Sequence, residues 1–316
     1  MREPCFLGID TSNYTTSLAF CSYSGEILAN LKCPLPVKDG ERGLRQSDAV
    51  FHHTKNLPVL FERAAECFQK WEPIAIGVSA TPRTVEGSYM PCFLAGKASA
   101  YAIGSVLGIP VYELSHQNGH IAAALYSSGA HPSVWDNEFV AFHVSGGTTE
   151  VVVVHPNDGD FRCKMIGGTA DMNAGQAIDR VGVFMGLSFP CGPEMERLAL
   201  TLDGKRSKGI RISVKDGMCN LSGLENMAKK RFTESGDKAQ TAKFVLDFIS
   251  ETLARITEDV CLTHCGLPIV YSGGVMSCSL IRKRLEAEGR YFAEPQFSAD
   301  NAAGISLLAR RLYLRQ

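Results

Sequence analysis

The fold of this chain is decided by the stretch Phe139–Gly147, which reads FVAFHVSGG. An apolar strand here ends directly in a serine and two glycines. Two later strings, Gly167-Gly168 and Ser272-Gly273-Gly274, also follow apolar runs. A strand that ends in small residues lets backbone N–H groups approach a phosphate closely, so these turns favour nucleotide binding. The glycines can equally serve tight turns, and both roles hold together because such a turn exposes the amides.

Outward from this stretch, hydrophobic periodicity predicts the order βββαβαβα twice, which is typical of an α/β protein. In the first half we expect strands at 6–10, 15–21, 26–32, 74–79 and 110–114, and helices at 48–70, 94–107 and 116–126. In the second half we expect strands at 139–144, 150–155, 162–166, 268–271 and 291–293, and helices at 174–185, 238–264, 279–288 and 301–314. Residues 191–236 are expected to be irregular and rich in charge, and the loop 129–137 to be a hinge between domains.

Length and composition place the chain among ordinary globular proteins. Its 316 residues favour two domains, and its 45% hydrophobic and 21% charged content is average. We expect no transmembrane helix and no signal peptide. The eleven cysteines are odd in number and scattered, which favours reduced thiols and a cytoplasmic location. A net charge of −1 gives no indication of nucleic acid.

A second site is predicted from two histidines and a distant aspartate. His116 and His120 are spaced i, i+4, so on a helix they project from one face and can bind one cation. Asp300, at the start of the last predicted helix, would make a third ligand. Histidine pairs at this spacing are often incidental. Three protein ligands with open positions would suit a metal that also binds water or substrate.

These motifs resemble one family closely, the tRNA threonylcarbamoyladenosine-synthesis family, also known as the glycoprotease or O-sialoglycoprotein endopeptidase family. The resemblance covers nearly the whole chain and rests on the strings Leu7–Ser12, Ser115–His120, Val144–Glu150, Gly168–Arg180, Phe189–Pro193, Ser272–Val275 and Asp300–Ala303. It implies two actin-like ATPase lobes, of the sugar-kinase and Hsp70 type, around a central nucleotide cleft. The lobes would be 1–130, with the helix 301–316 packed on it, and 131–300, with a helical insertion at about 172–236.

The resemblance also implies an activity and a set of site residues. The activity would be transfer of a threonylcarbamoyl group from threonylcarbamoyl-AMP to N6 of an adenosine beside the tRNA anticodon. One divalent metal, iron or zinc, would be bound by His116, His120 and Asp300, with Asp10, His116 and His120 as catalytic residues. ATP, ADP or the acyl-adenylate would be bound by His143, Val144, Ser145, Gly146, Gly147, Asp179, Gly192, Gly273, Gly274 and Cys278. A small paralogue and an ATPase are the partners it implies, with no membrane involved.

Several positions depart from the family pattern. Tyr14 and Thr15 stand where the family has two acids, and Asn118 replaces a glutamate. Thr148 replaces a histidine or asparagine, Cys278 an asparagine and Glu225 a lysine. Thr81-Pro82-Arg83 replaces a glycine turn and is followed by Glu86-Gly87-Ser88-Tyr89. Arg83 and Glu86 could form an ion pair or recognise a substrate carboxylate or phosphate.

These departures keep two further hypotheses open, a non-catalytic nucleotide- and metal-binding partner or regulator, and carbamoyl transfer to a small molecule. Metallopeptidase activity is disfavoured, because the string His116-Gln117-Asn118-Gly119-His120 lacks the glutamate that acts as general base in zinc proteases. From the resemblance, the expected protein is an acyltransferase of the actin-like ATPase fold.

Overall fold

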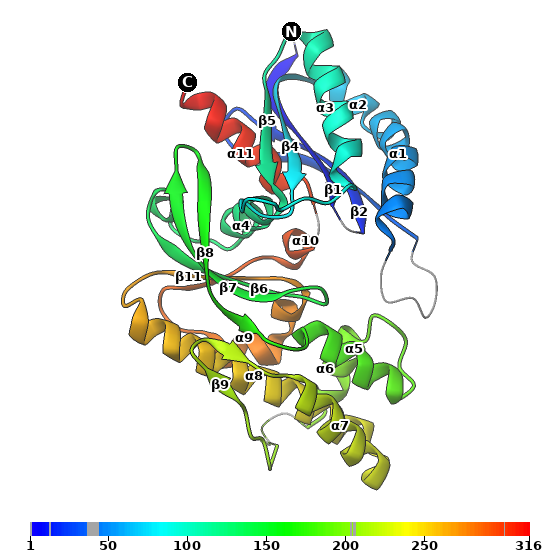
Figure 1. The fold of residues 1–316 in the computed structure, drawn as a ribbon, viewed down its shortest axis with the longest axis vertical. Helices are drawn as coiled ribbons and strands as arrows, with labels where there is room; N and C mark the ends of the chain where they lie inside the picture. The colour runs from blue at the N-terminus through cyan, green and yellow to red at the C-terminus, as the bar shows by residue number, and fades with distance from the viewer. Residues whose placement is uncertain (1, 13, 37–43, 203, 205–206, 300) are drawn as a thin grey trace. The chain divides into compact units, whose positions relative to one another are not determined.

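The computed structural model describes residues 2–12, 14–36, 44–202, 204, 207–299 and 301–316. These residues form two compact units, both drawn in Figure 1. Unit 1 comprises Met1–Ser127, Pro156–Arg162 and Ala299–Gln316, and unit 2 comprises Ser128–His155 and Cys163–Ser298. The predicted lobes, 1–130 with 301–316 and 131–300, differ from these units at residues 128–130, 156–162 and 299–300, and they stay a prediction about domains.

Unit 1 is built on a five-stranded sheet with the order β3-β2-β1-β4-β5. Its strands are β1 (Glu3–Ser12), β2 (Thr15–Ser22), β3 (Ile27–Pro34), β4 (Trp71–Thr81) and β5 (Val111–Ser115). The first three strands pair antiparallel, whereas β4 pairs parallel with both β1 and β5. The carboxyl ends of β1, β4 and β5 therefore meet at one edge.

Different helices cover the two faces of this sheet. The helices of unit 1 are α1 (Gln46–Arg63), α2 (Ala65–Lys70), α3 (Phe93–Leu107), α4 (His116–Ser127) and α11 (Ala303–Leu314). Leu7 and Ile9 share a buried core with Leu60 of α1 and Ala100 of α3. Gly8 points to the other face, where an added Cβ would collide with the carbonyl of Ala302. The sheet thus approaches the start of α11 closely enough that only glycine fits.

Unit 2 repeats the strand order in a seven-stranded sheet, β12-β11-β6-β7-β8-β10-β9. Its strands are β6 (Phe139–Val144), β7 (Thr149–Asn157), β8 (Asp160–Thr169), β9 (Val214–Lys215), β10 (Met218–Cys219), β11 (Ile269–Ser272) and β12 (Arg290–Phe292). The run β8-β7-β6-β11-β12 corresponds to β3-β2-β1-β4-β5 of unit 1. As in unit 1, the central strand is parallel to one neighbour, β11, and antiparallel to the other, β7.

Most helices of unit 2 contribute residues to one buried core with this sheet. The helices of unit 2 are α5 (Ala174–Phe184), α6 (Gly192–Leu200), α7 (Ser222–Ser235), α8 (Lys238–Thr263), α9 (Ser279–Leu285) and α10 (Pro295–Ser298), with the 3₁₀ helices η1 (Pro132–Asp136) and η2 (Gly274–Ser277). Phe142 and Val144 of β6 join Val245 and Ile249 of α8 in the main core. None of the helices in the described part of the chain combines the length and apolarity needed to cross a bilayer.

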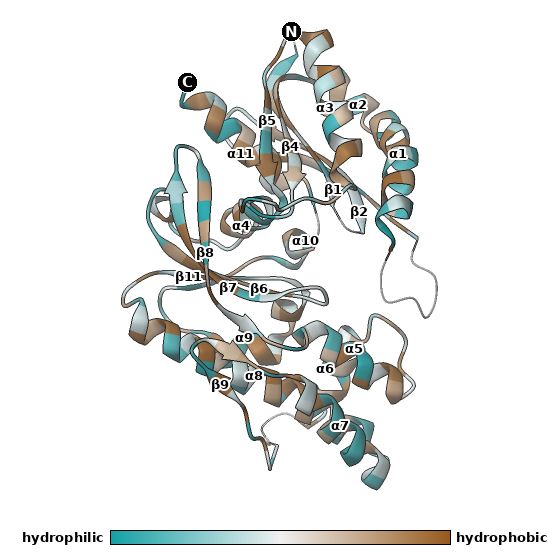
Figure 2. Cartoon of the chain, viewed as in Figure 1, coloured by the Kyte–Doolittle hydropathy of each residue, from teal (hydrophilic) through white to brown (hydrophobic). Residues whose placement is uncertain are grey.

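The expectation that residues 191–236 are irregular is wrong, because this region contains α6, α7 and the β9–β10 pair. The charged residues of α7 conceal its helical pattern, and Figure 2 shows this helix coloured largely as hydrophilic. Only Leu224 and Ala228 of α7 are buried, four residues apart on one face. Likewise, the single helix expected at 48–70 is two helices that meet at Ala64.

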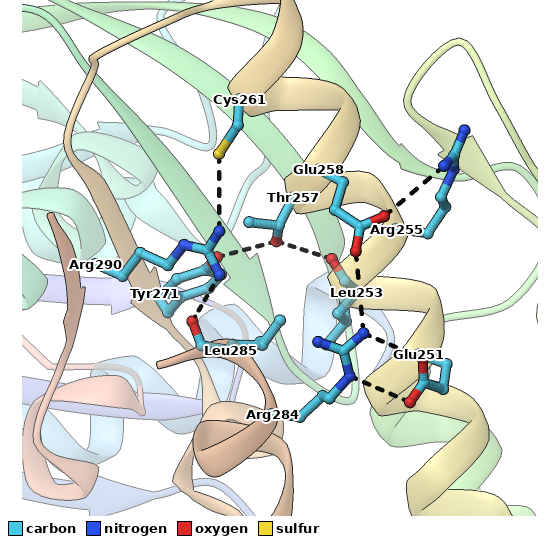
Figure 3. A network of polar contacts seen from close by, with 10 residues as sticks. All are labelled: Glu251, Leu253, Arg255, Thr257, Glu258, Cys261, Tyr271, Arg284, Leu285 and Arg290. Atoms are coloured by element: carbon cyan, nitrogen blue, oxygen red, sulfur yellow. Dashed lines mark hydrogen bonds and ion pairs between the residues drawn. The ribbon is translucent and has the colours of Figure 1, made fainter. Parts of the chain in front are cut away.

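Polar contacts fix β11 to the helices around it, as Figure 3 shows. The hydroxyls of Thr257 on α8 and Tyr271 on β11 lie 2.9 Å apart, and both residues are fully buried. The Arg290 guanidinium of β12 donates to the carbonyl of Leu285 at 2.9 Å, at the end of α9. The first bond holds β11, whose end carries Ser272, and the second holds β12, the strand that pairs with β11.

Candidate functional site

The end of β1 carries three buried polar side chains, Asp10, Thr11 and Ser12. The Ser12 hydroxyl donates to Asp10 Oδ2 at 2.7 Å. The same carboxylate oxygen lies 3.4 Å from Nδ1 of His116, at the start of α4. Asp10 Oδ1 is buried and has no hydrogen-bond partner among the described residues. A buried carboxylate oxygen of this kind indicates a place where a donor or a cation is accommodated.

The predicted histidine pair is brought together on the first turns of α4. Nε2 of His116 and Nε2 of His120 lie 2.9 Å apart, and their ring centroids lie 4.3 Å apart. Because Nδ1 of His116 faces the Asp10 carboxylate, we assign its proton to Nδ1, which leaves the lone pair on Nε2. A carboxylate behind a histidine in this way orients the ring and raises the basicity of the ligand nitrogen.

These residues fit a divalent transition metal, for which imidazole nitrogens are common ligands. The third predicted ligand, Asp300, lies outside the described residues. Within the part of the chain that the structure describes, no group of three or more histidine, cysteine, aspartate or glutamate residues forms a complete metal site. The structure therefore supports the histidine pair and its supporting carboxylate, and the three-ligand site stays a prediction.

Asn118, one of the departures from the family pattern, makes hydrogen bonds within unit 1 that hold the first turn of α4 in place. Its amide Nδ2 donates to Asp160 Oδ1 and to the carbonyl of Phe161, both at 2.8 Å. Its backbone N–H donates to the Ser115 hydroxyl, which caps the start of α4. Asn118 thereby fixes the turn of helix between the two histidines.

The predicted phosphate turn of unit 2 follows β6. The backbone N–H of Ser145 donates to the Thr148 carbonyl at 2.7 Å, and the Ser145 hydroxyl accepts from the Thr148 N–H at 3.1 Å. Inside this turn, a Cβ added at Gly146 or Gly147 would meet no atom within 4 Å. The two glycines thus face open space, and a ligand can approach their amides.

A second glycine turn follows β11 and packs against the first. Gly273 has a φ of 97°, and a Cβ there would collide with the carbonyl of Val144. Gly274, directly after it, meets nothing within 4 Å of an added Cβ. The pair therefore divides into one glycine required for close packing and one that exposes the backbone.

Helix α5 begins against the turn that follows β6. The N–H of Gly175 donates to the Ser145 carbonyl at 3.1 Å, and a Cβ on Gly175 would lie 2.6 Å from the nitrogen of Gly146. One turn later, Asp179 Oδ1 accepts a 2.8 Å hydrogen bond from the Cys191 N–H. Burial raises the pKa of Asp179 above its ordinary value, although the Cys191 bond opposes this. Gly192, the residue after Cys191, faces open space.

The structure gives less indication of a ligand role for Cys278 and for the Arg83–Tyr89 loop. Cys278 is 8% exposed in the core of unit 2, and burial raises its pKa to about 11. In the loop, the Arg83 N–H donates to the Ser88 hydroxyl at 3.1 Å, and Tyr89 is exposed, as is Tyr14. The ligand roles predicted for Cys278, Arg83 and Glu86 stay predictions.

Asp171 is a positioning residue that sequence reasoning missed. Its Oδ1 accepts from the backbone N–H groups of Met172 and Leu221, and its Oδ2 accepts from the N–H and hydroxyl of Ser222. Burial opposes ionisation, but these hydrogen bonds outweigh it and lower the pKa of Asp171. The carboxylate thus ties the start of α7 to the loop before α5. Its position within the Gly168–Arg180 string was the available signal.

The comparisons with solved structures define the fold. The chain is similar to full-length HypF in its phosphate- and nucleotide-bound form, with a TM-score of 0.60, 12% identity and 99% of this chain covered. It spans 55% of that HypF chain and 48% of HypF from T. kodakarensis. A ROK family glucokinase from Streptomyces griseus, in complex with glucose and AMPPNP, matches with a TM-score of 0.52, 13% identity and 97% and 99% of the two chains covered. The predicted α/β, actin-like ATPase type of fold is confirmed.

The sequence comparisons give the family. The sequence model of tRNA N6-adenosine threonylcarbamoyltransferase matches residues 39–307. The enzyme of that name from Thermus thermophilus is 29% identical over 320 residues, covering 100% of this chain and 94% of the relative. Its counterpart from Chlorobium phaeobacteroides is 30% identical over 327 residues, covering 96% and 90%. The chain belongs to the tRNA N6-adenosine threonylcarbamoyltransferase family, and the predictions of the family and of a transferase are confirmed.

Proposed function

We propose that this protein transfers the threonylcarbamoyl group of threonylcarbamoyl-AMP to N6 of adenosine in tRNA. The observation that carries the proposal is the match to the threonylcarbamoyltransferase family over residues 39–307. The geometry supports it in two places, the histidine pair beside Asp10 in unit 1 and the paired glycine turns in unit 2.

Each group of residues has a part in the proposed reaction. The open amides of Gly146, Gly147 and Gly274 bind the phosphate of the adenylate, and Asp179 and Gly192 help to bind the nucleotide. His116, His120 and Asp300 hold one divalent metal, iron or zinc, with Asp10 orienting His116. When bound, this metal would supply positive charge that polarises the carbamoyl carbonyl. Amides preorganised in a turn stabilise charge without reorganising during the reaction.

The chemistry is displacement at an activated acyl carbon. The N6 amino group attacks the carbamoyl carbon, the bond from that carbon to the phosphate oxygen breaks, and AMP leaves with the electron pair. One proton is lost from N6. Each of the eleven cysteines is a free thiol, which fits action in a reducing cytoplasm.

A transfer assay tests this proposal. The protein, the small paralogue and ATPase implied by the family resemblance, threonylcarbamoyl-AMP and unmodified tRNA are combined, and modified adenosine is measured by mass spectrometry. We expect modification that requires the protein. Breakdown of the adenylate with no tRNA product would favour a small-molecule acceptor. Nucleotide binding without consumption of the adenylate would favour a non-catalytic regulator.

A further inference from the structure

His143 is a polar residue in the otherwise apolar central strand of unit 2, one position from the end of that strand. Its neighbours Phe142 and Val144 are fully buried in the main core. Because side chains alternate along a strand, His143 projects from the opposite face of the sheet, where it is half-buried.

One hydrogen bond determines which ring nitrogen of His143 carries the proton. Nδ1 lies 3.1 Å from the Ser272 hydroxyl on the adjacent parallel strand. That hydroxyl donates its own proton to the Phe142 carbonyl, also at 3.1 Å. Because the Ser272 hydroxyl can then accept from His143, we assign the imidazole proton to Nδ1, which leaves the lone pair on Nε2. A neutral histidine in this tautomer is a base at Nε2.

A carboxylate lies across from the imidazole on the other neighbouring strand. Glu150 of β7 is the register partner of His143, and it is only 7% exposed. Ser272, His143 and Glu150 thus form one row across β11, β6 and β7, with their side chains on the same face.

The row lies at the edge of the sheet where the glycine turns begin. Both β6 and β11 end there, at Ser145-Gly146-Gly147 and Gly273-Gly274. In α/β sheets, ligands bind at the carboxyl ends of parallel strands. A base at this edge is therefore within one or two residues of the amides assigned to the adenylate.

We propose that His143 is a catalytic residue and that Ser272 positions it. As the N6 amino group attacks the carbamoyl carbon and AMP departs, the proton lost by N6 passes to Nε2 of His143 and then to water. This inference rests on the proposed function for the identity of the nucleophile. With water as the nucleophile, the same base would release AMP and threonylcarbamate from the adenylate.

The test uses His143→Gln, which keeps a polar side chain but removes the base, with His155→Gln as the matched control. His155 also lies in unit 2, where it is exposed and bonded to Glu138. The wild type and both variants are compared for AMP affinity, single-turnover transfer to tRNA, and AMP release without tRNA. General base catalysis contributes about 10²–10⁴-fold, so we expect transfer by His143→Gln to fall at least about 100-fold.

If Nε2 acts on the acceptor, AMP affinity should stay within about two-fold, whereas the nucleotide-binding role that the resemblance implies for His143 predicts a loss of AMP affinity. Ser272→Ala should lower the rate by only about five-fold, since it removes one hydrogen bond. Added imidazole should restore activity to His143→Ala, which a merely structural role would not allow.

The outcomes separate this inference from the proposed function. His143-dependent release of AMP in a wild type that does not modify tRNA would leave the base in place and refute tRNA as acceptor. Transfer by His143→Gln within about three-fold of the wild type would overturn the inference alone, as would a rate loss that only follows lost AMP affinity. A wild type with neither tRNA transfer nor AMP release would overturn both.

Discussion

The two units share one strand order, yet the ends of their central strands offer different chemistry. In unit 1, β1 ends in the buried side chains of Asp10, Thr11 and Ser12, and Asp10 lies beside His116. In unit 2, the equivalent strand β6 ends in Ser145-Gly146-Gly147, where backbone amides face open space. One topology therefore supports a site made of side chains in one unit and a site made of backbone in the other.

The glycines sharpen this contrast. In unit 1, Gly8 and Gly304 serve packing, because a Cβ at Gly8 would collide with the Ala302 carbonyl and one at Gly304 with the Gly119 carbonyl. In unit 2, Gly273 also serves packing, but its neighbour Gly274 does not. A glycine beside a strand end is thus evidence for a ligand only where its Cβ would meet nothing.

The largest effect should come from the side-chain site of unit 1. We expect His116→Ala to lower single-turnover transfer by about 1000-fold, because a bound cation contributes several kcal/mol of charge stabilisation. The control His131→Ala removes a histidine that only caps η1, and it should leave the rate unchanged. A rate for His116→Ala within about ten-fold of the wild type would show that unit 1 contributes no such site.

A smaller effect should separate the two glycines of the turn after β11. Gly273→Ala places a side chain at a φ of 97° and against the Val144 carbonyl, so it should lower the free energy of unfolding by about 3 kcal/mol. Gly274→Ala meets open space and should cost less than about 1 kcal/mol. Urea denaturation measures both, and equal losses would contradict the division of roles.

The smallest effect concerns Asp171, which ties α7 to the loop before α5. Replacing a carboxylate that caps a helix costs about 1 kcal/mol, so Asp171→Ala should lose that much stability at pH 7. The pKa of Asp171 is lowered in the folded protein. Its contribution is therefore present above the unfolded-state pKa and is lost as the pH falls through the folded-state value.

Urea denaturation at pH 7, 5 and 3 checks the sign of this dependence. The difference between wild type and Asp171→Ala should be constant from pH 7 to 5 and begin to shrink only below about pH 4. A difference that grows on acidification would show that the hydrogen bonds to Ser222 and Leu221 do not favour the charged form.

The sequence predicted β6 at 139–144 because a continuous apolar run bounded by a glycine turn has few alternatives. The hydrophobic pattern did not predict α6 and α7, because charged residues leave only two buried positions in each helix. Among site residues, the spacing of His116 and His120 predicted that they meet, since one helix carries both. The contact between Asp10 and His116 was not predictable, because it depends on β1 and α4 meeting across the sheet. Asn118 was read as a departure in the site, yet its amide bonds to Asp160 and Phe161.

The most direct test of two separate sites measures AMP affinity by calorimetry, together with bound metal, for His116→Ala and Gly274→Val. We expect His116→Ala to lose the metal and to bind AMP within about three-fold of the wild type, because the glycine turn that binds the phosphate is unchanged. We expect Gly274→Val, whose side chain fills the open space beside the turn, to keep the metal and to bind AMP about 100-fold more weakly. Two variants that each lose both ligands, or a Gly274→Val that binds AMP normally, would contradict the division between a side-chain site and a backbone site.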